Sequence, residues 1–123
     1  MAGRVLIVED EADLAWLERF YLEAAGYEVR IAHEGSAALE AIEDAVPDVL
    51  VLDVMVPNMD GWTILAEARE LPGTERMRVV LVSAMSSSRV EAQVEAFGVR
   101  EVLMKPFDMS DLVRAVEETL RAA

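Results

Sequence analysis

The apolar residues of this chain change their spacing about every ten to fifteen residues, from short unbroken runs to stripes spaced three and four residues apart. Unbroken runs are typical of strands that are buried on both faces, and the wider spacing is typical of amphipathic helices. Because parallel strands need crossover connections, regular alternation of the two patterns indicates repeated βα units. The 123 residues are enough for one such domain and too few for two.

Five strands and five helices are expected in strict alternation. The strands are expected at Arg4–Val8, Tyr27–Ile31, Asp48–Asp53, Val79–Ser83 and Glu101–Met104. The first helix should bury Leu14, Leu17, Tyr21 and Ala24 or Ala25 and end at Gly26. The other helices are expected at 35–45, through Trp62, Leu65 and Ala68 as far as Pro72, at 88–97, and from Ser110 onward. Right-handed crossovers then give a doubly wound three-layer α/β sandwich, with the second strand at an edge.

Charge and composition exclude several classes of protein. The net charge of −13 argues against direct nucleic-acid binding, which needs clustered Lys and Arg. Most acids, Glu18 among them, fall on predicted helix faces and are expected in solvent. The absence of cysteine excludes disulfides and cysteine-ligated zinc, and a single histidine, His33, excludes a histidine-rich metal site. No apolar run reaches membrane-spanning length and no signal-peptide pattern is present, so we expect a cytoplasmic protein with no membrane partner.

Four apolar runs each stop at a polar group. The expected strand at Arg4–Val8 is followed by Glu9-Asp10, and the strand at Asp48–Asp53 ends with Asp53. The strand at Val79–Ser83 ends with Ser83, and the strand at Glu101–Met104 is followed by Lys105, which is the only lysine in the chain. If these runs are parallel strands, the polar groups share the carboxyl edge of the sheet, where open α/β sheets bind ligands. Each group alone is more often a helix cap, a turn residue or a surface residue. Their shared position at one edge is what favours a site.

The residue types at this edge suit a divalent cation and a phosphoryl group. Asp10 and Asp53 are the expected metal ligands, with Glu9 acting directly or through water, because Mg²⁺ prefers carboxylate oxygens. A carboxylate such as Asp53 can attack phosphorus to form an acyl phosphate. The Lys105 ammonium and the Ser83 hydroxyl would then neutralise and bind the phosphoryl oxygens.

The same residues carry a family resemblance. The order is Glu9-Asp10, then Asp53 with Pro57 and Met59-Asp60-Gly61, then Ser83-Ala84, then Lys105-Pro106-Phe107. It closely resembles the receiver domain of two-component response regulators over essentially the whole chain, as a single domain of residues 1–123. The resemblance implies a five-stranded, flavodoxin-like (βα)5 sandwich with sheet order 2-1-3-4-5.

The resemblance also implies roles for particular residues. Asp53 would accept a phosphoryl group from a phosphohistidine of a sensor kinase or phosphotransfer protein. Mg²⁺, or Mn²⁺, would be held by Asp10, Asp53 and the backbone carbonyl of Met55, with Glu9 direct or through water. Ser83 and Lys105 would bind the phosphoryl group, and the Lys105–Pro106 peptide would be cis.

The family also sets expectations for partners. A downstream protein would bind the face made by the fourth helix, the fifth strand and the fifth helix. The chain would be a monomer or a phosphorylation-dependent dimer, and not an enzyme beyond its own phosphoryl transfer and hydrolysis.

One position departs from the family pattern. Receivers usually carry Tyr or Phe three residues before the lysine as a switch partner of the hydroxyl residue, here Ser83, and this chain has Val102. An alternative function is therefore a receiver-like interaction module that works without phosphorylation, although the intact acid, serine and lysine set speaks against it. An aspartate-based phosphohydrolase is less favoured because Met55 replaces its usual second Asp. A flavin-binding module is disfavoured because no Gly/Ser/Thr-rich phosphate loop follows the first strand.

Two methionines predict how long a phosphoryl group would remain on this chain. In this family, the residues two positions beyond the acceptor and two beyond the hydroxyl residue tune hydrolysis, and here they are Met55 and Met85. Neither side chain offers a polar group that could orient an attacking water. We therefore expect slow hydrolysis.

Overall fold

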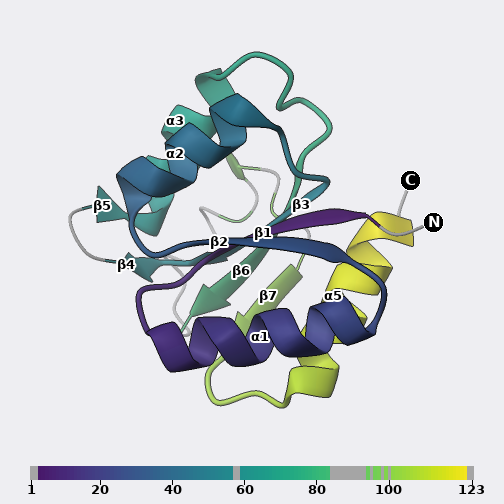
Figure 1. Ribbon diagram of the computed structural model, residues 1–123. Coiled ribbons are helices and arrows are strands. Elements are labelled where there is room, and N and C mark those ends of the chain that lie inside the picture. The colour runs from purple at the N-terminus through teal and green to yellow at the C-terminus, as the bar shows by residue number, and fades with distance from the viewer. Residues whose placement is uncertain are drawn as a thin grey trace.

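Five parallel strands form the central sheet of the computed structural model, which describes residues 3–56, 59–83, 94, 96–97, 99 and 101–121. The strands are β1 (Arg4–Val8), β2 (Glu28–Ala32), β3 (Val49–Asp53), β6 (Arg78–Ser83) and β7 (Glu101–Met104). Their order across the sheet is β2-β1-β3-β6-β7, which confirms the expected order 2-1-3-4-5 (Figure 1). β2 lies at an edge, as its alternation of polar and apolar residues predicted.

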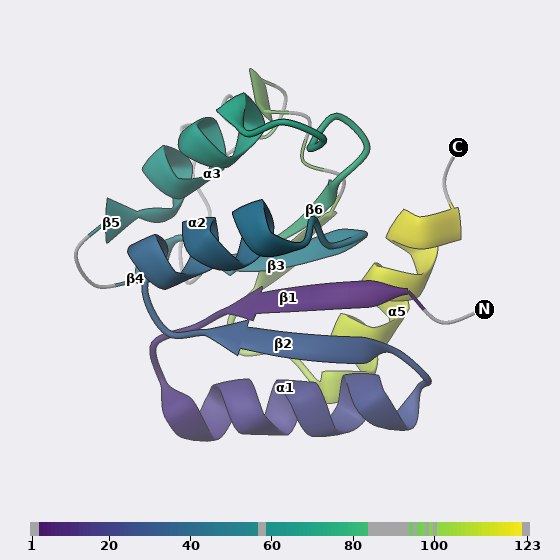
Figure 2. The same cartoon turned by 45° about the horizontal axis from the view of Figure 1, so that its top comes forward.

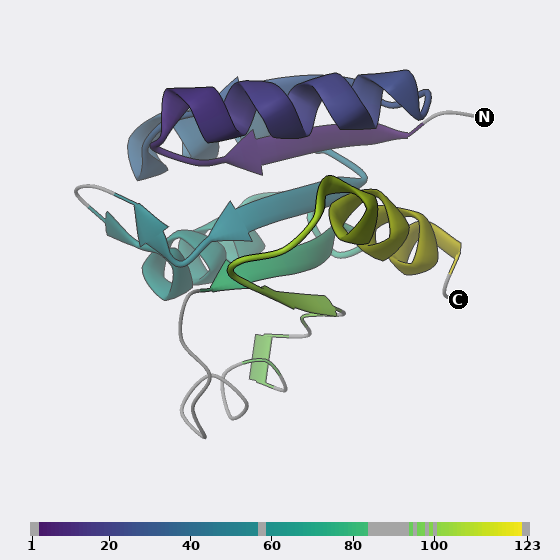
Figure 3. The ribbon, with the colours of Figure 1, turned by 90° about the horizontal axis from the view of Figure 1, so that it is seen from below.

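Helices cover both faces of this sheet. α1 (Ala12–Ala24) and α5 (Met109–Arg121) pack together on one face, and α2 (Gly35–Asp44) and α3 (Gly61–Glu70) pack together on the other (Figure 2). Seen from below, α1 and α5 lie in front of the strands (Figure 3). The expected helix at 88–97 falls mostly outside the described residues, but Val94, Ala96 and Phe97 are helical. The three-layer sandwich is therefore confirmed.

The strands divide their side chains between two hydrophobic clusters, because successive residues of a strand point to opposite faces. Leu6, Leu50 and Leu81 belong to the cluster beneath α2 and α3. Val5, Val51 and Val80 belong to the cluster beneath α1 and α5. Every residue of β3 is buried, as its unbroken apolar run predicted for a central strand.

The face that α1 turns toward the sheet differs from the expected one. Leu17 and Tyr21, which the spacing placed inside, are 37% and 42% exposed, and Ala24 and Ala25 are exposed as well. The prediction was wrong because apolar residues surround most of this helix, so their spacing does not single out one face. The residues that the helix buries are Ala15, Glu18 and Leu22.

Glu18 was expected in solvent and is instead 1% exposed. Neither of its carboxylate oxygens has a hydrogen-bond partner among the described residues. Glu18 comes three residues after Ala15 and four before Leu22, so it lies on the same face of α1 as these two residues, and this face packs on the sheet. The α1–α5 side of the sheet thus contains a carboxyl group that the sequence pattern did not reveal.

A short antiparallel hairpin follows β3 and was not expected. β4 (Met55–Val56) pairs with β5 (Met59–Asp60), and Gly61 comes directly after it. A Cβ atom on Gly61 would lie 2.5 Å from the Cα of Val54, so no other residue fits without a shift of the backbone next to Asp53. Asp60 caps α3 by accepting hydrogen bonds from the Thr63 backbone N–H and hydroxyl.

No helix among the described residues is both long enough and apolar enough to cross a membrane.

The buried carboxyl of Glu18 predicts a pH-dependent stability. Burial raises the pKa of Glu18 from 4.5 to about 7; the charge of Lys105 opposes this shift and that of Asp53 adds to it. Because the folded protein holds this proton more tightly than the unfolded chain does, stability falls as pH rises from about 4.5 through about 7. We expect Glu18→Leu to increase the free energy of unfolding, and to do so by roughly 2–3 kcal/mol more at about pH 8 than at about pH 5.

Urea unfolding at the two pH values measures this difference. Glu67→Leu is the matched control, because Glu67 is an exposed glutamate on α3. An equal gain from Glu18→Leu at both pH values would contradict a raised pKa.

Candidate functional site

The polar residues that end the strands meet at the carboxyl edge of the sheet. Glu9 directly follows β1, Asp53 and Ser83 are the last residues of β3 and β6, and Lys105 directly follows β7. The parallel register pairs Val8 with Leu52, Asp53 with Val82, and Ser83 with Met104, so the four ends lie side by side. Regular β structure therefore positions each of these groups.

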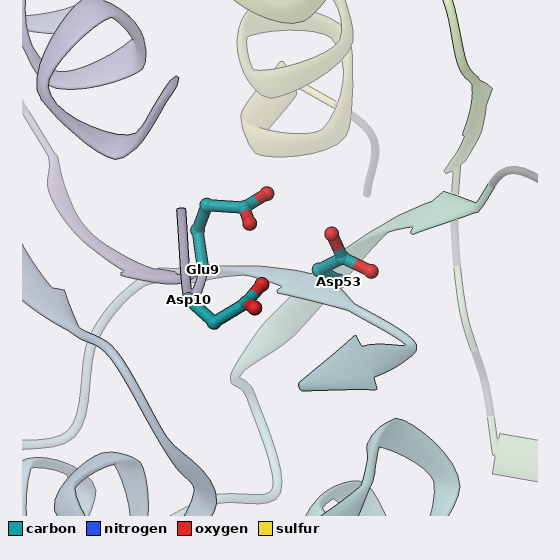
Figure 4. Close-up of side chains that lie close together, drawn as sticks. All are labelled: Glu9, Asp10 and Asp53. Carbon is teal, nitrogen blue, oxygen red and sulfur yellow. The ribbon is translucent and has the colours of Figure 1, made fainter. Parts of the chain in front are cut away.

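Three carboxylates form a cluster at this edge. Glu9, Asp10 and Asp53 each place an oxygen within 4.8 Å of the others (Figure 4). Glu9 and Asp53 are 2% and 3% exposed, whereas Asp10 is open to solvent. Such a cluster of hard oxygen donors, with one open side, fits a divalent cation such as Mg²⁺.

Strand geometry explains why Glu9 and Asp53 converge. Glu9 continues the alternate series of Val5 and Ile7, and Asp53 continues that of Val49 and Val51. Both carboxylates therefore belong to the α1–α5 side of the sheet.

Lys105 pairs with the cluster. Its Nζ lies 2.7 Å from Oδ2 of Asp53 and 3.7 Å from Oε1 of Glu9. Burial acts to lower the pKa of Lys105, but the hydrogen bond to Asp53 and the charges of Asp53, Glu9 and Glu18 outweigh it and raise the pKa. The backbone N–H of Lys105 donates to the carbonyl of Ser83 at 2.9 Å, and the Lys105–Pro106 peptide bond is cis. The ammonium is thus held in the charged form against Asp53.

The pKa of the Glu9 carboxyl group is strongly raised. Burial raises its pKa to about 8; the N–H of Glu11, which donates to Oε2 at 3.1 Å, lowers it, and Asp53 raises it further. A cation bound at this point would favour the ionised form of Glu9 and so lower its pKa.

Two residues near the site were not anticipated by the sequence pattern. Glu18 on α1 interacts electrostatically with Lys105 and Asp53. His33, set aside as a lone histidine, places Nδ1 3.0 Å from the backbone carbonyl of Glu9. Neither position has a sequence signature, because both contacts depend on how α1 and the loop after β2 dock on the sheet.

The remaining predicted residues divide into those near the edge and those outside the described part of the chain. Ser83 is fully buried at the end of β6. Val102 on β7 faces Leu81 and packs on the cluster beneath α2 and α3. The backbone of Met55 lies in β4, and Met85 is outside the described residues. Phe97 stacks on Trp62 and Phe107 packs on the α1–α5 side, so both rings take part in packing.

This arrangement can support chemistry on a phosphoryl group. Asp53 offers a carboxylate oxygen, and Lys105 holds a positive charge beside it. Phosphoryl transfer asks little more of a protein than positioning and charge neutralisation.

Comparisons with known proteins point the same way. The family model of the response regulator receiver domain matches residues 5–117. The chain is 32% identical over 123 residues to the phosphate regulon transcriptional regulatory protein PhoB of Rhizobium meliloti (strain 1021). It spans 54% of that protein, so it covers about half the length of this curated relative.

Solved structures agree with the sequence match. The chemotaxis response regulator CheY4 of Vibrio cholerae superposes with a TM-score of 0.90 at 26% identity, covering 97% of this chain and 99% of that one. A putative response regulator from Chloroflexus aurantiacus J-10-fl gives a TM-score of 0.88 at 32% identity, covering 99% and 100%. Since the family match runs from β1 into α5 and includes every strand of the sheet that builds the acidic edge, the chain belongs to the response regulator receiver domain family.

Proposed function

We propose that this chain is a phosphoacceptor in two-component signalling and that Asp53 is the residue phosphorylated, with a phosphohistidine of a sensor kinase or phosphotransfer protein as the donor. Family membership supports the phosphoacceptor role. The observation that carries the residue assignment is the 2.7 Å contact between Lys105 Nζ and Asp53 Oδ2 within the acidic cluster.

The proposed transfer uses groups that this edge already holds. A carboxylate oxygen of Asp53 attacks phosphorus, the O–P bond forms as the P–N bond to the donor histidine breaks, and the donor imidazole leaves with the electron pair. The Lys105 ammonium follows the phosphoryl oxygens and offsets their charge, and the Ser83 hydroxyl donates a hydrogen bond to one of them. Hydrolysis by water returns the carboxylate.

The proposed metal set is Asp10, Asp53 and the backbone carbonyl of Met55, with Glu9 direct or through water. The three carboxylates each place an oxygen within 4.8 Å of the others, which supports Mg²⁺, with Mn²⁺ as a substitute. When bound, the ion would neutralise charge on the phosphoryl oxygens. Lys105, whose Nζ lies 2.7 Å from Asp53 and 3.7 Å from Glu9, supplies positive charge beside the two buried carboxyl groups.

The readout is proposed to pass through Ser83 and position 102 to a partner-binding face made by the 88–97 segment, β7 and α5. Val102 packs on the α2–α3 side of the sheet and has neither a ring nor a hydroxyl to rearrange. This observation favours a second candidate function, a module that binds its partner without phosphorylation. The two candidates differ in whether Asp53 is modified.

Intact mass after incubation with a small acyl-phosphate donor, with and without Mg²⁺, tests the assignment. We expect a metal-dependent gain of one phosphoryl group that is lost in Asp53→Asn, because the amide cannot act as the nucleophile. Asp48→Asn is the control, because Asp48 is an exposed aspartate before β3. A protein that gains no mass would favour the phosphorylation-independent module.

Removing the ammonium should affect both chemistry and stability. In Lys105→Gln we expect phosphorylation to slow by roughly 100-fold, because one charged donor to the phosphoryl oxygens is lost. The free energy of unfolding should fall by roughly 1–3 kcal/mol, less than for a fully buried pair because the Lys105 side chain is 31% exposed.

The control for Lys105→Gln is Arg19→Gln, which removes a cation from an exposed pair with Glu23. Phosphorylation kinetics and urea unfolding measure the two effects. An unchanged phosphorylation rate in Lys105→Gln would rule out the proposed role of the ammonium.

The two methionines predict a long-lived phosphoryl group. Decay of the phosphorylated protein at saturating Mg²⁺ should be slow, and Met85→Asn should accelerate it, because an amide can orient an attacking water. Met104→Asn changes an exposed methionine on β7 and should leave the rate unaltered. Rapid decay of the unmodified chain would refute this expectation.

A further inference from the structure

Glu18 is a buried carboxyl group to which the proposed phosphoryl transfer gives no role. It lies in the middle of α1, on the face that packs on the sheet, and is 1% exposed. Within the described part of the chain, neither of its carboxylate oxygens has a hydrogen-bond partner. A buried carboxylate that lacks both a hydrogen bond and an opposite charge is strongly destabilising. Glu18 therefore needs either a proton or a cation close by.

Glu18 lies on the same side of the sheet as the acidic edge. Glu9 and Asp53 belong to the α1–α5 side, and Figure 4 shows their carboxyl groups rising from the strands toward these two helices. Lys105 joins this group, with Nζ 2.7 Å from Oδ2 of Asp53. The charge of Lys105 acts on Glu18, and that of Glu18 acts on Lys105 in return. The ammonium that pairs with Asp53 is thus also the cation available to Glu18.

The elements that pack against α1 offer Glu18 no other cation among the described residues. These elements are β1, β2 and α5. The buried residues of α5 are uncharged: Leu112, Ala115, Val116 and Thr119. On the same side of the sheet, β2 contributes Val29 and Ile31, whereas Arg30 donates to carbonyls of α2. The residue that follows β1, Glu9, is itself acidic. Lys105 therefore has two sets of acceptors, the carboxylates of the edge and the carboxyl group of α1.

The charge on Glu18 changes near neutral pH. Burial raises its pKa to about 7; the charge of Lys105 opposes this shift and that of Asp53 adds to it. Glu18 is therefore mostly protonated at about pH 6 and mostly ionised at about pH 8, with the proton released to solvent. The ionised form attracts the ammonium and repels a phosphoryl group that arrives at Asp53. Both effects act against phosphorylation.

We propose that Glu18 is a positioning residue that competes with the phosphoryl group for the Lys105 ammonium. In its ionised form it draws the ammonium toward α1, and in its protonated form it leaves the ammonium to Asp53 and the phosphoryl oxygens. Glu18 does not touch the reacting atoms and acts only through Lys105 and through its charge. The effect on phosphorylation rests on the proposed function, whereas the interaction with Lys105 does not.

The interaction is tested on the unphosphorylated full chain. Because Lys105 is the only lysine, a protein made with isotope-labelled lysine gives one side-chain ammonium signal in an NMR spectrum. We expect this signal to shift as Glu18 titrates, with a midpoint near about pH 7, and Glu18→Gln to remove this step because the amide does not ionise. A separate step near pH 8, where the pKa of Glu9 lies, should remain. Glu23→Gln, which changes an exposed glutamate of the same helix, should keep both steps.

The effect on phosphorylation is tested with a small acyl-phosphate donor and Mg²⁺. At about pH 6 the rates of the original chain and of Glu18→Gln should be equal, because Glu18 is then protonated. At about pH 8 Glu18→Gln should react roughly three- to tenfold faster, because one negative charge near Asp53 is absent. Glu18→Leu, also uncharged, should show the same gain at the higher pH, and Glu23→Gln should show none. Circular dichroism checks that each variant is folded.

The results separate this proposal from the proposed function. A step near pH 7 that persists in Glu18→Gln would overturn the interaction with Lys105. Loss of that step with equal rates at both pH values, or with a slower rate in Glu18→Gln, would overturn the competition for the ammonium. A chain that gains no phosphoryl group at either pH would refute the phosphoacceptor role and the effect on rate, while the Lys105 signal would still decide whether Glu18 acts on the ammonium.

Discussion

One ammonium group balances the negative charge at the carboxyl edge of the sheet. Lys105 reaches both Asp53 and Glu9 from the end of β7, and this contact joins the last strand to the central one. Two buried carboxylates would otherwise face each other in an apolar surrounding, at a cost of several kcal/mol. Burial is the main cause of the raised pKa of Glu9, and the neighbouring Asp53 raises it further. A cation bound beside this carboxyl group would favour its ionised form.

The sheet determines how these charged groups come together, and most of its strands could be predicted from the sequence. Long unbroken runs such as Val49–Asp53 identify buried parallel strands, and polar residues at their ends then fall at one edge without any knowledge of helix packing. For this reason Glu9, Asp53, Ser83 and Lys105 could be assigned to the edge from the chain alone. The order of the strands, in contrast, was predicted from the family resemblance and not from the periodicity.

The predictions that were wrong or absent concern packing. The inner face of α1 could not be read from a helix that is apolar on most of its circumference, and the error exchanged Leu17 and Tyr21 for Ala15 and Glu18. A buried glutamate has no sequence signature, because its burial depends on the rotation of the whole helix. The same rotation exposes Trp16 and Phe20, so one packing choice both buries a carboxyl near the site and creates an apolar outer surface.

Gly61 has a consequence for how this chain can vary. Gly61 lies so close to the backbone of Val54 that a Cβ atom at position 61 would be only 2.5 Å from the Val54 Cα. Any mutation that gives residue 61 a side chain therefore acts first on the backbone next to Asp53, the residue that we propose as the phosphoryl acceptor. Gly61 therefore limits sequence variation through its effect on the backbone, although it has no reactive side chain.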